Sequence, residues 1–372
     1  MTFMQDLTVG MVGLHHPHSV GHLRTLDTLP EVARIVVWEA DASVLDELRA
    51  EAPGTQLEAA ADLAALLARD DLAFVVAAER NDRNPDLFVS ILEAGHHLLA
   101  EKPFGRSADD ARRVLAAAQQ ADRQLAVFYT NRYHPLIRAA RELVRGGALG
   151  ELYSIELRML TTQIRSRGAD LWLFDRDAAG GGILSWLGCH YLDLLHALTG
   201  DEVESVMAET ATRGHDPVSV EDIATVAIRM RSGALASLHA GYVLANSGGG
   251  FYDSGYDTHV GVHGREGRLW WEDIGSGQLH LESRTPAFQD APRRTFSYVL
   301  AESRAYGGVH GEEFVRDFLK ATRNEGATPC PGKAALRVAL ITDAAYESAR
   351  TGTRIAVPLP TEQSWFAHSR SR

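Results

Sequence analysis

The stretch that decides the fold is Leu7-Thr-Val-Gly10-Met-Val-Gly13-Leu14-His15-His16-Pro17-His18-Ser19-Val20-Gly21-His22. Its apolar first half predicts a buried strand over Leu7–Val12, and a glycine turn then leads into a helix. A strand, a glycine turn and a helix N-terminus form a pyrophosphate site, because free backbone N–H groups and the helix dipole face the anion. We therefore predict a dinucleotide site formed by Gly10, Gly13, Leu14, His15 and His16.

Apolar runs and helical patterns continue to alternate as far as about residue 130. The runs that predict strands are Leu7–Val12, Ile35–Trp38, Leu72–Ala77, His97–Ala100 and Leu125–Tyr129. The helical patterns between them are His22–Leu29, Ser43–Glu51, Ala61–Ala68, Pro85–Ala94 and Ala108–Ala121. Such alternation predicts a doubly wound parallel sheet with helices on both faces. The expected first domain is a Rossmann domain over residues 1–130.

The pattern changes after residue 130, where one helix, Pro135–Arg145, precedes a series of alternating segments. These predict strands with one solvated face, and hence a large, open, mostly antiparallel sheet. They are Glu151–Met159, Val203–Thr210, Ile223–Arg229, Leu235–Val243, Thr258–His263, Arg268–Trp271, Leu279–Glu282 and Thr295–Leu300. Helices are expected over Leu184–Leu198, Gly311–Arg323 and Ala334–Arg350. The second domain is expected to be an α+β domain over residues 131–372.

Composition excludes several classes of protein. Lys plus Arg number 37 against 49 for Asp plus Glu, a formal charge of −12. This balance argues against a nucleic-acid or anionic-membrane binder, because phosphate backbones attract clustered cations. Two cysteines do not make a disulfide framework. No signal peptide and no apolar window of membrane-spanning length are evident, so a cytoplasmic location is expected.

The end of the second predicted strand indicates which nicotinamide cofactor binds. Glu39 lies there, 26 residues after Gly13. A carboxylate at this point accepts hydrogen bonds from both ribose hydroxyls and repels a 2′-phosphate, which favours NAD over NADP. The loop itself departs from G-x-G-x-x-G, because His15 stands where the second glycine is expected.

Four histidines, His15, His16, His18 and His22, lie in or beside the glycine loop. Imidazole is a common metal ligand, but neither cysteines nor an HExxH frame accompany these residues, so no metal site is predicted. Two interpretations remain open: one or two of these histidines line the phosphate or substrate mouth, or they are loop histidines without a function.

Three further segments carry a resemblance to a known family. They are Glu93-Ala-Gly-His-His-Leu-Leu-Ala-Glu101-Lys102-Pro103, then Asn131-Arg132-Tyr133-His134-Pro135 with Gly147-Ala-Leu-Gly150-Glu151, and Gly180-Gly-Gly-Ile-Leu-Ser-Trp186-Leu-Gly188-Cys-His190-Tyr-Leu-Asp193. In order and spacing they resemble the E-K-P and G-G-G…G-x-H-x-x-D segments of the glucose–fructose oxidoreductase and inositol dehydrogenase (Gfo/Idh/MocA) family. The similarity spans most of the chain.

The resemblance implies an NAD-dependent oxidoreductase of a sugar, cyclitol or related hydroxy compound, with Lys102 and His190 at the reaction centre. Oxidation of a carbinol needs a base for the hydroxyl proton, and imidazole suits that role. A cation beside the oxygen stabilises the developing alkoxide. The substrate is expected to meet Asp193, Trp186, Arg132 and Tyr133. The cofactor is expected also to contact Ala78, Arg80, Glu101 and Lys102.

Two positions depart from the family pattern. Trp186 stands one helical turn before His190, where the inositol dehydrogenase branch has an Asp that orients the imidazole. Three interpretations remain open. Asp193 takes over the role of the missing Asp, or Trp186 is a stacking platform for a sugar ring and Lys102 carries more of the proton transfer. In the third, the protein is a weak or inactive relative. The loop Ala78–Arg83 lacks the family's T-P-N-x-x-H, and Arg80 and Arg83 are expected to supply positive charge to phosphate oxygens.

Two alternative functions stay open on the sequence alone. One is an NAD-retaining enzyme that oxidises, eliminates and re-reduces a glycoside, and the other is a catalytically degenerate cofactor-binding relative. The second domain's sheet has few helices to cover it, so an open apolar face and a homodimer or homotetramer through this sheet are expected. For the glycine-rich segment 246–256, closure over the substrate cleft, a place in the oligomer interface and an ordinary mobile loop all stay open.

Overall fold

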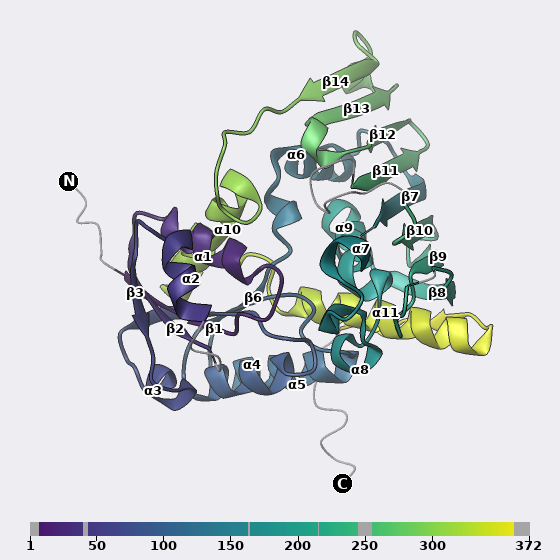
Figure 1. The fold of residues 1–372 in the computed structure, drawn as a ribbon. Coiled ribbons are helices and arrows are strands. Elements are labelled where there is room, and N and C mark those ends of the chain that lie inside the picture. Colours follow the sequence, from purple (N-terminus) through teal and green to yellow (C-terminus); the bar gives the residue numbers. More distant parts are fainter. Residues whose placement is uncertain (1–6, 40–43, 163, 215, 245–254, 361–372) are drawn as a thin grey trace.

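The predicted N-terminal sheet is present in the computed structural model, which describes residues 7–39, 44–162, 164–214, 216–244 and 255–360 (Figure 1). Its six strands run parallel in the order β3-β2-β1-β4-β5-β6. The order reverses between β1 and β4, where open α/β sheets bind ligands. The strands are β1 (Leu7–Val12), β2 (Val32–Trp38), β3 (Gln56–Ala59), β4 (Leu72–Ala77), β5 (Leu98–Ala100) and β6 (Leu125–Val127).

Helices cover both faces of this sheet, as the alternation predicts. Helices α1 (Ser19–Asp27) and α10 (Gly308–Thr322) lie on one face, and α4 (Asn84–Glu93) and α5 (Ala108–Gln120) lie on the other (Figure 1). Although α10 falls within the range expected for the second domain, it packs against α1 and β4. The chain therefore returns to the first sheet near its end. The remaining helices here are α2 (Val44–Glu51) and α3 (Leu63–Leu67).

The second sheet has nine strands in the order β14-β13-β12-β11-β7-β10-β9-β8-β15. Neighbours are antiparallel except for β7 and β10, which run parallel. The bounds are β7 (Leu152–Thr161), β8 (Val203–Ala211), β9 (Ile223–Met230), β10 (Leu235–Gly241), β11 (Tyr256–Gly264), β12 (Gly267–Trp271), β13 (Gln278–Ser283), β14 (Arg293–Ser297) and β15 (Ile355–Ala356). The expected mostly antiparallel sheet is confirmed.

Helices pack on only one face of the second sheet, between it and the Rossmann domain (Figure 1). They include α6 (Pro135–Arg145), α7 (Ile164–Arg167), α8 (Arg176–Ala179), α9 (Cys189–Thr199) and α11 (Lys333–Thr351). The helix expected over Leu184–Leu198 is divided, because a short π-helical segment, Leu184–Gly188, precedes α9. Helix α11 contacts β8 of the second sheet and also α5 of the first domain.

The uncovered face of the second sheet corrects one expectation, because it is mostly polar rather than apolar. Strand β9 alternates buried and exposed residues, and its exposed positions are Thr225, Ala227 and Arg229. Neighbouring strands present the same kind of side chain in register, including Glu209, Ser237, His239, Arg158 and His259. The large hydrophobic side chains that are exposed on these strands are Tyr153, Met207 and Leu235, at 49%, 43% and 53%. Alternation places the apolar residues inward, where the helices are.

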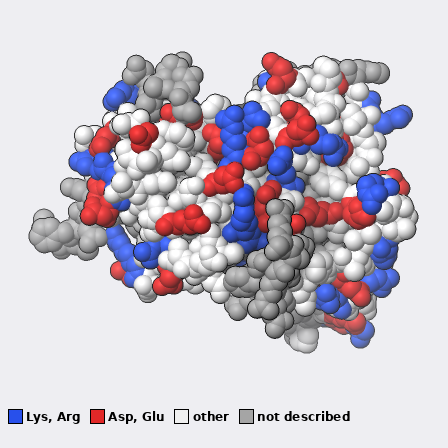
Figure 2. Space-filling view, turned by 90° about the horizontal axis from the view of Figure 1, so that it is seen from below, with Lys and Arg blue, Asp and Glu red and all other residues white. Residues whose placement is uncertain are grey.

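The molecular surface mixes both signs of charge. On the face shown in Figure 2, basic and acidic side chains are interleaved, and both are densest across the middle. Where the chain is described, no helix is both long enough and apolar enough to cross a bilayer.

Candidate active site

The turn after β1 is built around Gly13. Its φ of +81° is one that side-chain-bearing residues rarely adopt, and a Cβ there would lie 2.9 Å from the carbonyl oxygen of Ala78. The hydroxyl of Ser19, the first residue of α1, donates to the carbonyl oxygens of Gly13 at 3.3 Å and Ala78 at 3.2 Å. Gly10 lies inside β1, where a Cβ would meet Val75 at 3.0 Å. Gly10 thus packs closely against Val75, and its cofactor contact stays a prediction.

Two carboxylates converge on the loop after Gly13. Glu39 follows β2 and accepts a hydrogen bond from the backbone N–H of Leu14 at 2.6 Å. His15 Nδ1 lies 3.0 Å from Glu79 Oε2 and 3.4 Å from Glu39 Oε1, so its ring turns toward these carboxylates. The second domain reaches the same loop, because the indole N–H of Trp172 donates to the carbonyl oxygen of His15 at 3.0 Å.

The loop Ala78–Arg83 does not present the free positive charge expected of it. Arg80 donates from Nε and Nη2 to both carboxylate oxygens of Asp82, at 3.1 and 3.0 Å. Arg83 Nη1 lies 3.7 Å from Glu79 Oε1. Because each guanidinium faces a carboxylate of the same loop, their charges are largely balanced locally.

Glu101, the acid of the E-K-P segment, is the centre of a buried histidine cluster. His18 Nδ1 lies 3.0 Å from its Oε1, and His22 Nε2 lies 2.6 Å from its Oε2. His16 Nε2 lies 3.9 Å from Oε1. Burial by itself raises the pKa of Glu101, but His18, His16 and the hydrogen bonds outweigh burial and hold this pKa well below its usual range. An ionised carboxylate therefore sits among three imidazoles.

The possible ligand atoms of His16, His18 and Glu101 lie within 4.8 Å of one another, close enough to hold a metal ion. The hydrogen bonds of the cluster argue against this use. The backbone N–H of His18 donates to Nδ1 of His16 at 3.2 Å. A neutral His16 therefore carries its proton on Nε2, the atom that faces Glu101, and has no lone pair there for a metal. The geometry is that of a hydrogen-bonded network around a carboxylate.

Lys102 is fully buried beside this network. Its Nζ donates to the backbone carbonyl oxygen of Trp186 at 3.0 Å and lies 3.7 Å from the centre of the Trp186 ring. Glu101 Oε1 is 4.0 Å away. Burial lowers the pKa of Lys102. The peptide bond between Lys102 and Pro103 is cis.

The indole ring of Trp186 thus packs against the amino group of Lys102. At the position of Trp186 the inositol dehydrogenase branch has an Asp. Its ring is 1% exposed and also packs against His16 and His18, with centroids 5.1 and 5.2 Å away. A cation over an indole face is attracted by the ring quadrupole. The role of Trp186 in this structure is to hold Lys102, and a sugar does not reach its enclosed ring.

His190 and His18 line one large cavity of about 510 Å³, a size typical of small-molecule sites. Lys102 is not among the lining residues. Burial, and next the charge of Lys102, hold the pKa of His190 well below its usual range, so the ring is neutral. Nδ1 of His190 is buried and has no hydrogen-bond partner among the described residues. The other lining residues are Asn131, Met159, Leu187, Tyr191, Gly255, Tyr256, Thr258, Asp273, Ile274, Gly275 and Tyr306.

The structure pairs Arg132 with Asp193 and so corrects two expectations about them. Arg132 donates from Nε to Asp193 Oδ2 at 2.6 Å, and from Nη2 to Oδ1. Asp193 is 2% exposed and does not line the large cavity. A carboxylate that binds a guanidinium at both oxygens is not free to support His190 or to receive a substrate. Tyr133 likewise faces elsewhere, since its hydroxyl donates to Asp317 at 2.9 Å.

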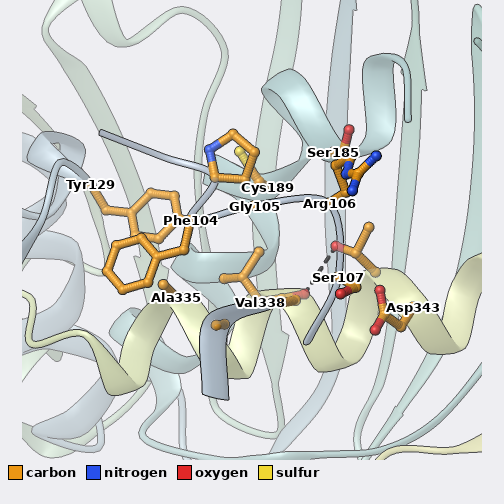
Figure 3. Close-up of a pocket in the computed structure, with 14 residues that line it drawn as sticks. Phe104, Gly105, Arg106, Ser107, Tyr129, Ser185, Cys189, Ala335, Val338 and Asp343 are labelled. Carbon is orange, nitrogen blue, oxygen red and sulfur yellow. Dashed lines mark hydrogen bonds between the residues drawn. The ribbon is translucent and has the colours of Figure 1, made fainter. Parts of the chain in front are cut away.

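A second, much smaller cavity lies beside Pro103 and against α11 (Figure 3). Phe104 and Tyr129 lie at one end, and Ser107 and Asp343 lie at the other (Figure 3). Its volume of about 30 Å³ has room for about one or two water molecules. Burial raises the pKa of the lining Cys189 thiol to about 11, so the thiol stays protonated. This cavity is a packing feature and not a ligand site.

Sequence reasoning missed several residues of the large cavity. The sequence leaves open whether His18 lines the substrate mouth, and the structure places it on the cavity, whereas Asn131 is found only as part of a motif. Tyr306 and Asp273 carried no sequence signal, because they lie far along the chain in irregular segments. The segment 246–256 falls mostly outside the described residues, although Gly255 and Tyr256 do line the cavity.

Comparison with known proteins agrees with this architecture. Residues 7–129 match the model of the oxidoreductase family with an NAD-binding Rossmann fold, and residues 137–270 match the Gfo/Idh/MocA C-terminal domain. A levoglucosan dehydrogenase of Pseudarthrobacter phenanthrenivorans is 26% identical, with 95% of this chain and 99% of that protein covered. The myo-inositol 2-dehydrogenase of Thermotoga maritima is 23% identical, with 72% and 76% covered.

Solved structures show the same fold. A levoglucosan dehydrogenase in complex with NADH and levoglucosan superposes with a TM-score of 0.82 at 22% identity, with 95% of this chain and all of that chain covered. The WlbA dehydrogenase from Bordetella pertussis, in complex with NADH and UDP-GlcNAcA, gives 0.80 at 22% identity, with 95% and 99% covered. Both domain models together span most of the chain. This protein belongs to the Gfo/Idh/MocA family of oxidoreductases, and its first domain is an NAD-binding Rossmann domain.

Proposed function

We propose that this protein is an NAD-dependent dehydrogenase of a sugar, cyclitol or related polyhydroxylated compound. The observation that carries the proposal is the large cavity, in which two neutral imidazoles, His18 and His190, stand with many hydroxyl and amide groups. Polar groups that converge in a partly apolar cavity orient a ligand rich in hydroxyls. Relatives named for levoglucosan, myo-inositol and D-apiose support the same substrate class.

The first domain fits NAD at two places. Gly13 allows a tight turn against Ala78, where a Cβ would collide, and this turn leads into α1, whose N-terminal N–H groups attract a pyrophosphate. Glu39 lies at the carboxyl end of β2, where a carboxylate accepts hydrogen bonds from ribose hydroxyls. NAD, when bound, accepts a hydride from the substrate carbon. Glu39 supports NAD as the preferred cofactor over NADP.

We assign Lys102 and His190 to the reaction centre. Lys102 lies just after β5, at the carboxyl edge of the sheet. Its amine is fully buried, so in the charged form it acts strongly on a developing alkoxide. Its cation–π contact with Trp186 fixes the position of that charge. His190 lines the cavity and supplies a neutral imidazole to a substrate hydroxyl. Support for these roles comes from the motif, the burial and the cavity together.

A substrate panel tests the proposal. Levoglucosan, D-xylose, D-apiose and myo-inositol are offered with NAD or with NADP, and the nicotinamide absorbance is followed. We expect net reduction of NAD by at least one of them, and slower or no reduction of NADP. A Gly13→Val variant serves as the control, since its side chain would collide with Ala78 and abolish cofactor binding. Tightly retained NAD without net absorbance change would point instead to an oxidation–elimination–reduction enzyme.

We further propose that the protein is a homodimer or homotetramer through the second sheet. Helices leave one face of nine strands uncovered, and Met207 and Leu235 are exposed there. A mostly polar face of this kind suits an interface rich in hydrogen bonds and ion pairs. Light scattering is expected to give two or four times the monomer mass, and a monomeric mass would contradict this.

A further inference from the structure

We infer that His18, oriented by Glu101, is the catalytic base that removes the proton from the substrate hydroxyl. This inference rests on the proposed dehydrogenase function and adds a residue to its site. It begins from a contrast within the cavity. His190 has lost the acidic neighbour that would orient it, and its Nδ1 is buried without a partner among the described residues. His18 lines the same cavity and does have a carboxylate partner.

The hydrogen bond between His18 and Glu101 fixes the tautomer of His18. Glu101 is ionised and only accepts, so His18 must donate from Nδ1 across the 3.0 Å contact. A neutral His18 then has its lone pair on Nε2, the atom at the other end of the ring. The described residues give Nε2 no hydrogen-bond partner, which leaves it available to a substrate hydroxyl.

The surroundings of His18 keep this base neutral until it reacts. Burial lowers the pKa of His18 to about 4, and the charge of Glu101 opposes that shift. The titratable groups around the ring are Glu101, His16, His22, Lys102, His190 and Tyr306. When Nε2 takes a proton, the adjacent carboxylate balances the new charge, as in other carboxylate–histidine pairs.

Packing holds the ring of His18 in one orientation. The ring centroid of His18 is 5.2 Å from that of Trp186 and 4.6 Å from that of Tyr306. Helix α1 begins at the next residue, Ser19, so the backbone of His18 is fixed by the helix start. A base is effective when its geometry is set before the substrate arrives.

The proposed step balances in atoms and electrons. The substrate O–H bond breaks and its proton passes to Nε2 of His18, while the C–H bond breaks and a hydride leaves for NAD, the two-electron acceptor. A carbon–oxygen double bond forms, so the carbinol is oxidised and NAD is reduced. Lys102 stabilises the negative charge that develops on oxygen.

The first measurement reads the tautomer without any turnover. Side-chain ¹⁵N NMR of protein labelled at histidine reports which ring nitrogen carries a proton, and a His18→Gln spectrum identifies the His18 signals. We expect His18 protonated at Nδ1 and bare at Nε2 in the wild type. A Glu101→Gln variant is expected to lose this preference. Protonation of His18 at Nε2 in the wild type would overturn the inference.

The second measurement compares turnover of three variants on whichever panel sugar is oxidised. We expect His18→Gln to lower kcat by about 10²–10⁴-fold, the range for removal of a general base, with little change in NAD affinity. His97→Asn is the matched control. His97 lies just before β5, at the end of the strand opposite to the one that Glu101 follows. Wild-type kcat in His18→Gln with loss of activity in His190→Gln would overturn the role of His18 but leave the dehydrogenase assignment intact. Failure of the wild type on every sugar would instead overturn both the proposed function and this role.

Discussion

Replacement of Lys102 by methionine is expected to lower kcat by about 10²–10³-fold, the loss typical when one preorganised oxyanion stabiliser is removed. Methionine keeps an unbranched side chain that still packs against Trp186, so the buried site is not emptied. What disappears is the ammonium, which is the positive charge that follows β5. NAD affinity is expected to stay nearly unchanged, because the glycine turn and Glu39 are untouched. Steady-state kinetics with a panel sugar and NAD titration measured by fluorescence check both expectations.

Two further variants test whether the effect depends on an ammonium group at position 102. Lys102→Arg is expected not to restore kcat, since a planar guanidinium does not fit where a compact ammonium sits 3.7 Å above an indole ring. The chain has only three lysines, and Lys320, which is 57% exposed and pairs with Asp317, supplies the control. Lys320→Met is expected to turn over like the wild type. Wild-type kcat in folded Lys102→Met would remove Lys102 from the reaction centre.

The fold was largely predictable because hydrophobic periodicity is a local signal. Strands β1 and β4 have the bounds that their apolar runs predict. Strand β3 was missed because Gln56–Ala59 is a short, partly exposed edge segment without an apolar run. The parallel pairing of β7 with β10 could not be predicted either, because it depends on how the chain crosses between them and not on the hydrophobic pattern of either strand.

The candidate site was predictable only where its signal was a contiguous motif. Glu101, Lys102 and His190 could be found because each lies in a segment that resembles the family. The partners of these residues could not, because they are set by tertiary contacts. His18 meets Glu101 across 83 positions, and Lys102 meets Trp186 across 84. Residue type at one position does not reveal which distant group will face it.

The pairing of Arg132 with Asp193 gives the second large effect, which is one of stability. The two residues are 61 positions apart, and their ion pair joins the segment after β6 to helix α9. Asp193→Leu is expected to lower the free energy of unfolding by about 3–5 kcal/mol, because it leaves a mostly buried guanidinium without its counter-charge. Urea unfolding followed by tryptophan fluorescence measures the change.

A double variant separates the ion pair from the individual side chains. Arg132→Met combined with Asp193→Leu removes both charges, so it is expected to unfold at a urea concentration much closer to the wild type than Asp193→Leu does. Glu347→Gln, which breaks an exposed pair with Arg350, is the control and is expected to leave the midpoint unchanged. If Asp193 instead bound the substrate, Asp193→Asn would raise KM while stability stayed at the wild-type level. The enclosed, two-point contact with Arg132 favours the loss of stability, because a carboxylate that is already held by a guanidinium links the segment after β6 to helix α9 before any substrate is present.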